Sequence, residues 1–170
     1  MKDKSSEKIP DTKIYLASPF FNDKQKKRIN KAKKLLSENK TVSVIHFPFD
    51  FQYKDANVED PNNDIFGSQV WIDSTYENDI SAMTTSDAGV FLYDLDREDS
   101  GSAFELGFLR ALHKPAIIVL FGKDTRNTPV NLMIAGGGTR FFHGDTEFNK
   151  LAKYNFNHFP SDKDFNFKVF

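Results

Sequence analysis

The chain has 170 residues, of which 39% are hydrophobic and 28% charged, a composition typical of one soluble globular domain. The formal net charge of -1 excludes a global field favouring polymeric nucleic acid or an anionic membrane, and the absence of cysteine excludes disulfides, thiolate catalysis and Cys-ligated metals. No apolar run approaches the roughly 20 residues that span a bilayer. We therefore expect a cytoplasmic protein that uses neither nucleic acid nor a membrane as partner.

Strand-like and helix-like segments alternate along the chain. Residues 1–12 are polar and predict a flexible tail without a signal peptide, followed by a single domain over 13–170. Apolar runs predict strands at 13–18, 42–49, 88–93, 116–121 and 139–142. Amphipathic or capped segments predict helices at 23–39, 69–85, 102–113, 130–135 and 146–154. This alternation predicts an α/β domain with a five-stranded parallel sheet covered by helices on both faces.

The stretch from Asp94 to Gly107 is the most informative part of the sequence. It links a predicted strand to a predicted helix and contains a loop rich in carboxylates. In open α/β sheets such loops line the ligand crevice at the carboxyl ends of the strands. Several carboxylates at that place favour chemistry that needs a nucleophile and a proton donor together.

Glu105 has two interpretations. Ser102-Ala103-Phe104-Glu105 matches a capping box, in which the Glu side chain only closes the first turn of its own helix. The alternative is a nucleophile, because a helix N-terminus favours an ionised carboxylate and such a group can attack a sugar carbon.

Asp79 lies on the predicted helix 69–85, beside an apolar stripe of Ile72, Tyr76, Ile80 and Met83. Burial there would raise the pKa of Asp79 and suit it to donate a proton, whereas a boundary position would leave it pointing to solvent. This helix leads into a strand, so bringing Asp79 to the crevice requires an unusual helix placement, which the long polar connection 50–67 could permit.

Other candidates carry weaker signals. The four histidines show no metal-ligand spacing, so no metal is expected. Ser100-Gly101-Ser102 could cradle a phosphate, but the neighbouring carboxylates would repel it. Asn131 followed by Leu132 and Met133 is by itself a helix cap with core residues. The Phe-rich end of the chain could pack on its own domain or at a subunit interface.

Four motifs, in this order, resemble the nucleoside 2-deoxyribosyltransferases of lactic acid bacteria. They are Ile14-Tyr15-Leu16-Ala17-Ser18-Pro19-Phe20, Thr75-Tyr76-Glu77-Asn78-Asp79, Gly101-Ser102-Ala103-Phe104-Glu105-Leu106-Gly107 and Asn131-Leu132-Met133. The resemblance extends over nearly the whole chain from Lys13. The segments 99–105 and 112–115 look most like the purine-restricted branch.

The resemblance implies a flavodoxin-like fold and a homohexamer, built as a trimer of dimers, with sites shared between subunits. It also implies transfer of 2-deoxyribose between nucleobases without a cofactor, so the partners are 2-deoxyribonucleosides and free nucleobases. By this resemblance Glu105 attacks C1′ of the sugar and forms a covalent intermediate. A second base then attacks, and two inversions give net retention.

The resemblance also implies roles for other residues. Asp79 and Asp99 would protonate and orient the base or hold sugar hydroxyls, and Tyr15 would position the nucleophile or substrate. Gln52 matches a base-contacting Gln of the branch that accepts purines and pyrimidines, which conflicts with the purine-like segments elsewhere; purine preference is the prediction.

Three further residues are implied to bind substrate from the neighbouring subunit. Asn131 and Met133 would surround the sugar and its 5′-hydroxyl. The chain ends in Phe170 where family members commonly end in Tyr, so the terminal carboxylate is retained and the phenol hydroxyl is missing.

Two other functions remain as alternatives. An N-glycosidase of 2-deoxynucleoside 5′-monophosphates would use water as acceptor and bind phosphate through Ser18, Ser100 and Ser102. A non-catalytic nucleotide-binding module would bind its ligand without releasing a base.

Overall fold

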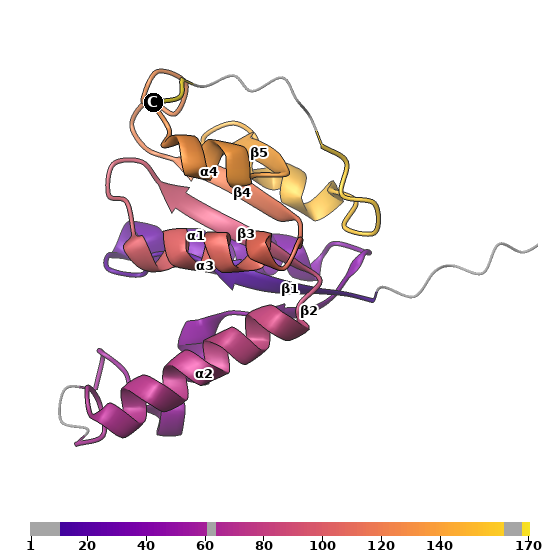
Figure 1. Cartoon of the computed structure of the whole chain (residues 1–170). Helices are drawn as coiled ribbons and strands as arrows, with labels where there is room; N and C mark the ends of the chain where they lie inside the picture. Colours follow the sequence, from indigo (N-terminus) through magenta and orange to yellow (C-terminus); the bar gives the residue numbers. More distant parts are fainter. Residues whose placement is uncertain (1–10, 61–63, 162–167) are drawn as a thin grey trace, which may run out of the picture.

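Five parallel strands form the centre of the molecule, in the order β2-β1-β3-β4-β5 (Figure 1). The computed structural model describes residues 11–60, 64–161 and 168–170, so most of the predicted tail 1–12 lies outside the described residues, while Thr12 already belongs to β1. The strands are β1 (Thr12–Ala17), β2 (Val42–His46), β3 (Ala88–Asp94), β4 (Ala116–Phe121) and β5 (Arg140–His143). The parallel α/β sheet predicted from the sequence is confirmed, and its strand order is that of flavodoxin-like folds.

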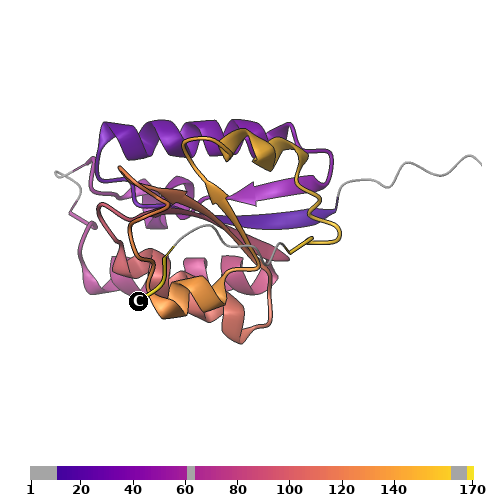
Figure 2. The same cartoon turned by 90° about the horizontal axis from the view of Figure 1, so that it is seen from above.

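Helices cover both faces of this sheet (Figure 2). The α-helices are α1 (Asp23–Ser37), α2 (Gln69–Thr85), α3 (Ser100–Ala111) and α4 (Leu132–Gly137). Short 3₁₀ turns occur as η1 (Pro48–Phe51), η2 (Tyr53–Asp55) and η3 (Phe148–Lys153). Helix α1 and η3 lie on one face, whereas α2, α3 and α4 lie on the other. None of these helices is long and apolar enough to cross a bilayer.

Several predicted boundaries were wrong, for local reasons. The second strand ends at His46 instead of residue 49, because Pro48 begins a 3₁₀ turn. The last predicted helix, 146–154, is the 3₁₀ turn η3. Helix α1 ends at Ser37 instead of residue 39, and it is capped by Asn22, whose side chain accepts from the amide of Gln25.

Alternation along each strand divides the core into two layers. Ile14 and Leu16 of β1 pack toward α1, whereas Tyr15 and Ala17 pack toward α2 and α3. All four residues are at most 1% exposed. The Tyr15 side chain therefore lies between the sheet and the helices α2 and α3.

A buried ion pair ties α1 to the carboxyl end of β3. Arg28 donates to Asp94 at 2.6 Å, and Gln25 donates to the same carboxylate oxygen at 3.3 Å. Burial by itself would raise the pKa of Asp94, but the hydrogen bonds from Arg28 and Gln25 outweigh it and hold the pKa below its ordinary value. The pair thus fixes the point from which the acidic loop 95–99 departs.

Replacing one partner of this pair should be strongly destabilising. In Arg28→Met the Asp94 carboxylate stays buried without its cation, which should lower the free energy of unfolding by about 3–5 kcal/mol in urea titrations at pH 7. Lys34→Met, an exposed change on the same helix, should cost less than about 0.5 kcal/mol.

The cost of Arg28→Met should also depend on pH. Because the folded-state pKa of Asp94 is depressed, the pair stabilises the fold above the ordinary Asp pKa and this contribution is lost as the pH falls through the folded-state pKa. The difference between the two proteins should therefore shrink in acid. A difference below about 1 kcal/mol at pH 7 would contradict this account.

Candidate active site

Glu105 is bound by a residue from a distant strand and does not cap its own helix. The Tyr15 hydroxyl of β1 donates to Glu105 Oε1 at 2.6 Å, although the two residues are 90 positions apart in sequence. Glu105 lies in the second turn of α3, on the side of that helix that faces the sheet near β1. A carboxylate and a phenol hydroxyl from two elements thus meet between α3 and β1.

Asp99 is the residue that caps α3. Its Oδ2 accepts from the Ser102 amide at 2.9 Å and from the Ser102 hydroxyl at 2.8 Å, while Oδ1 faces the Gly101 amide at 3.4 Å. The capping-box interpretation, with Ser102 as cap and Glu105 as its partner, is therefore wrong. Helix α3 starts at Ser100, two residues earlier than predicted, and the Glu105 side chain does not take part in capping it.

Two carboxyl groups in this site have pKa values shifted toward neutrality. Burial raises the pKa of Glu105 to about 7; the Tyr15 hydrogen bond lowers it, and the charges of Asp79 and Asp99 raise it. Burial also raises the pKa of Asp79 to about 6. Burial and the adjacent Glu105 charge raise the pKa of Tyr15 far above its ordinary value, so its hydroxyl remains a donor. The site therefore holds two carboxyl groups, Asp79 and Glu105, each of which can gain or lose a proton near pH 7.

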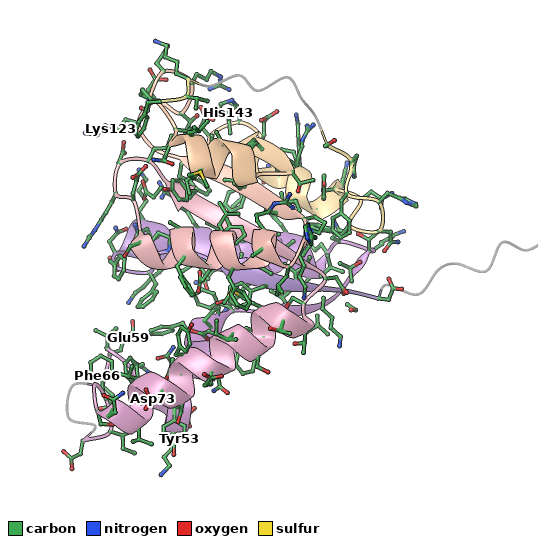
Figure 3. All side chains as sticks on the ribbon, in the orientation of Figure 1. Tyr53, Glu59, Phe66, Asp73, Lys123 and His143 are labelled. Carbon is green, nitrogen blue, oxygen red and sulfur yellow. The ribbon has the colours of Figure 1, made fainter. Side chains whose placement is uncertain are left out.

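Helix α2 brings Asp79 to the face that carries Tyr15 and Glu105. It lies diagonally beside α3, and its N-terminal half, which carries Asp73, projects beyond the sheet, with Tyr53 and Phe66 nearby (Figure 3). The connection between β2 and α2 packs against this helix: the Trp71 indole donates to the Ala56 carbonyl at 2.7 Å. Asn78, next to Asp79, donates to the Phe51 carbonyl at 3.3 Å.

The predicted apolar stripe of α2 is only partly buried. Met83 is 1% exposed, but Ile72 is 46% and Tyr76 is 50% exposed. Tyr76 contacts Phe104 of α3, which is itself 51% exposed, with ring centroids 6.2 Å apart. The part of the stripe before Asp79, Ile72 and Tyr76, is thus an apolar surface, whereas Ile80 and Met83 pack into the core.

Two other predicted contacts follow β1 and β2 at the carboxyl edge of the sheet. Ser18 is half-buried and donates through its hydroxyl to the Pro19 carbonyl at 2.9 Å. Gln52 lies between η1 and η2 and is half-buried, and among the described residues its side-chain amide donates to the Pro48 carbonyl alone, at 3.4 Å. Gln52 therefore has an amide that a small ligand at this edge could recruit.

Asn131, Met133 and Phe170 form a second group, beside α4. The Asn131 side chain accepts from the Met133 amide at 2.9 Å and caps α4. The backbone of Phe170 pairs with Val130 and Leu132, which places the chain end beside the start of α4 (Figure 1). Asn131 and Met133 line a groove of about 700 Å³ between α3 and α4, and the lining of that groove does not include Glu105.

Sequence reasoning missed a stack of aromatic rings beside Tyr15. His46 stacks on Tyr15 with centroids 5.8 Å apart, and Phe51 stacks on His46 at 4.4 Å. The parallel register pairs Tyr15 with His46, so both side chains lie on the same face of the sheet. Strand register cannot be read from the sequence, so the place of His46 beside Tyr15 is visible only in the structure. The described residues include no cluster of three or more metal-ligating side chains.

Fold and site together define an α/β protein of flavodoxin-like strand order with carboxylates held near β1. A family model described as nucleoside 2-deoxyribosyltransferase matches residues 14–138, and the nucleoside deoxyribosyltransferase of Limosilactobacillus fermentum is 45% identical over 98% of this chain and 99% of that protein. The chain belongs to the nucleoside 2-deoxyribosyltransferase family, as its motifs predicted.

Solved structures agree with this fold. The 2-deoxyribosyltransferase of Bacillus psychrosaccharolyticus superposes with a TM-score of 0.74 at 28% identity, over 89% of this chain and 98% of that one. A CMP N-glycosidase of Clostridium botulinum gives a TM-score of 0.55 at 19% identity, over 84% of this chain and 100% of that one, a likeness of fold alone.

Removing the Tyr15 hydroxyl should raise the pKa of Glu105 above about 7, because the hydrogen bond that favours the ionised carboxylate is lost. NMR titration of the Glu105 carboxyl carbon in Tyr15→Phe measures this change. Tyr154→Phe, which removes a hydroxyl on the opposite face of the sheet, should leave the Glu105 pKa unchanged. An equal shift in both variants would show that the Tyr15 contact does not control Glu105.

Proposed function

We propose that this protein transfers 2-deoxyribose from one nucleobase to another through a covalent intermediate on Glu105. The observation that carries the proposal is the half-buried Glu105 carboxylate, held by the Tyr15 hydroxyl at 2.6 Å and flanked by Asp79. The membership of this chain in the nucleoside 2-deoxyribosyltransferase family supports 2-deoxyribose as the sugar that is transferred and nucleobases as leaving group and acceptor.

Glu105 acts as the nucleophile in the first step. One of its oxygens attacks C1′, the bond between C1′ and the base nitrogen breaks, and the sugar becomes an ester of Glu105. The transition state carries positive charge on the sugar, which the carboxylate stabilises before it bonds. Tyr15 keeps the carboxylate oriented and favours its ionised form, so the attacking oxygen is available near neutral pH.

Asp79 carries the proton that the leaving base needs. The pKa of Asp79, about 6, lies below that of Glu105, about 7, so in the free enzyme a proton shared by the two groups resides mainly on Glu105. The reactive form, with Asp79 protonated and Glu105 ionised, is a minor species from which the reaction proceeds. Protonated Asp79 donates to the departing base, which leaves neutral. The incoming base returns a proton to Asp79 as its nitrogen attacks C1′ and the ester bond to Glu105 breaks. Two inversions leave the configuration at C1′ unchanged.

Asp99 organises the start of α3 in this proposal, since its oxygens accept from Ser102 and Gly101. Gln52, with its loosely held amide, contacts the edge of the base, and Ser18 lies at the same edge of the sheet. We further propose that purines are preferred, on the resemblance of segments 99–105 and 112–115 to the purine-restricted branch.

The hydrogen bonds of the serine hydroxyls argue against an N-glycosidase that acts on nucleoside monophosphates. Ser18 and Ser102 were the hydroxyl candidates for a phosphate, together with Ser100, but Ser18 donates to Pro19 and Ser102 donates to Asp99. A phosphate near Ser102 would also face the Asp99 carboxylate. These contacts favour a nucleoside over its monophosphate as substrate.

Glu105→Ala should abolish transfer. Incubation of deoxyinosine with adenine should yield deoxyadenosine and hypoxanthine, and the variant should lose at least about 10³-fold in rate while keeping its thermal midpoint. Glu77→Ala, which removes an exposed carboxylate on α2, is the matched control and should remain active. A 2′-fluorinated deoxynucleoside should leave a sugar adduct on the Glu105 peptide, detectable by mass spectrometry.

The same assay tests the finer claims. Cytosine in place of adenine should react more slowly, and deoxyinosine 5′-monophosphate should be a poorer donor than deoxyinosine. Base release that is unaffected by acceptor and favoured by the 5′-phosphate would establish the glycosidase instead. Undiminished transfer by Glu105→Ala would exclude the assigned nucleophile.

We also propose that the protein is a homohexamer, a trimer of dimers, in which Asn131, Met133 and the Phe170 carboxylate complete the site of a neighbouring copy. Two separate apolar surfaces support this. One comprises Ile72, Tyr76 and Phe104, and the other Leu132, Met133, Val169 and Phe170, with exposures from 46% to 78%. A closed hexamer of this symmetry needs two kinds of interface.

Shared sites predict complementation between two inactive variants. Glu105→Ala lacks the nucleophile, whereas Asn131→Asp keeps the oxygen that caps α4 but loses the amide group. After dissociation and random reassembly of equal amounts, about a quarter of the sites should combine an intact Glu105 with an intact Asn131 of another copy. Transfer activity should return accordingly. A mixture no more active than its separate components, or a monomeric mass by light scattering, would contradict shared sites.

A further inference from the structure

The ammonium group of Lys114 holds the C-terminal end of α2. It donates to the Met83 carbonyl at 2.9 Å and also to the carbonyls of Thr84 and Ser86. The last carbonyls of a helix have no partner within the helix, and a cation is favourable at that end. One side chain from outside the helix therefore satisfies three backbone acceptors at the end of α2.

Lys114 is itself fixed to α3. Its amide donates to the Leu109 carbonyl at 3.0 Å, and the Arg110 guanidinium donates to the Lys114 carbonyl at 2.7 Å. The side chain thus has a rigid base on the C-terminal end of the helix that carries Glu105. It connects the ends of α2 and α3 directly.

Strand β1 joins the same junction. Asp87 follows Ser86, donates through its amide to the Lys13 carbonyl at 2.8 Å, and accepts from the Lys13 amide at 2.7 Å. Lys13 is two residues before Tyr15, so the three elements carrying Asp79, Glu105 and Tyr15 are linked where α2 leads into β3 (Figure 1). Asp87 is also the charged group that acts on the Lys114 ammonium.

Helix α2 has little apolar burial to hold it in place. Met83 is its one fully buried side chain, while Val70, Ile72 and Tyr76 are 53%, 46% and 50% exposed. Asp79 stands four residues before Met83, on the same side of the helix and one turn from the carbonyls that Lys114 binds. The position of Asp79 therefore depends on polar anchors, of which Lys114 supplies the nearest to the C-terminal end.

We infer that Lys114 is a positioning residue for the transfer reaction: by clamping the end of α2 to α3 it sets the place of Asp79 relative to Glu105. This inference rests on the proposed function for its kinetic consequences, whereas its structural consequence, the place of Asp79, can be measured without turnover. Lys114 belongs to the segment Leu112–Pro115, and the inference gives it the role of holding two helices together.

A double-mutant cycle tests the inference. Lys114→Met keeps the aliphatic stem and removes the donors, and we expect kcat to fall roughly tenfold to a hundredfold, with KM changing less, because Asp79 is misplaced for the transition state. In an Asp79→Asn background the same change should cost less than about twofold, since the group it positions is already absent. Lys34→Met, an exposed lysine on the opposite face, should have no effect in either background.

NMR titration of the Asp79 carboxyl gives a readout that does not need turnover. In Lys114→Met the pKa of Asp79 should fall from about 6 toward its ordinary value, because movement of α2 exposes the carboxyl to water. Loss of a nearby positive charge alone would raise that pKa, so the sign separates movement from simple electrostatics.

The outcomes are distinct. An equal loss of kcat in both backgrounds, or an Asp79 pKa that stays the same or rises, would overturn the inference. A wild-type protein without transfer activity would refute the proposed function, and the Asp79 titration would still decide the clamp. If Lys114→Met does not fold, Lys114→Arg serves as the second variant. Its planar fork cannot place one nitrogen on three carbonyls, and a smaller fall in the Asp79 pKa is expected.

Discussion

The hydrogen bond from the Tyr15 hydroxyl to Glu105 is the interaction on which the site depends. A carboxyl group taken out of water beside another carboxyl group favours its neutral form, and burial raises the pKa of Glu105 to about 7. The Tyr15 hydroxyl opposes this shift and fixes the orientation of the carboxylate. Because the pKa of Tyr15 is raised far above its ordinary value, the hydroxyl keeps its proton and the contact persists across the physiological range.

The strand order explains why these two side chains can meet. In the order β2-β1-β3-β4-β5 the direction of winding reverses between β1 and β3, and ligand crevices open at such points. Tyr15 is paired in register with Gly89 of β3, where a Cβ atom would lie 2.6 Å from Leu109 of α3. The missing side chain at Gly89 lets α3 approach the sheet closely, and this approach brings Glu105 within reach of Tyr15.

The sequence predicted the sheet, the alternation of elements and the bounds of α2, because apolar periodicity is a local property. It identified Glu105 and Asp79 as carboxylates in suggestive places, but their environment could not be read from spacing. The capping alternative for Glu105 fails because Asp99 takes the cap, and Tyr15 becomes its partner through a contact across 90 residues. The His46 and Phe51 stack was likewise hidden, since it depends on strand register and on the 3₁₀ turn after Pro48.

Helix α2 connects the proton chemistry with assembly. Its apolar stripe has the periodicity of a core face, yet Ile72 and Tyr76 are half exposed, and Tyr76 stands three residues before Asp79. A second copy that covered Tyr76 and Phe104 would remove more water from Asp79 and raise its pKa further above its ordinary value. Since Asp79 is proposed to carry the proton of the leaving base, subunit association and proton affinity would then be linked: conditions that protonate Asp79 would favour the covered state, and association would favour the protonated acid.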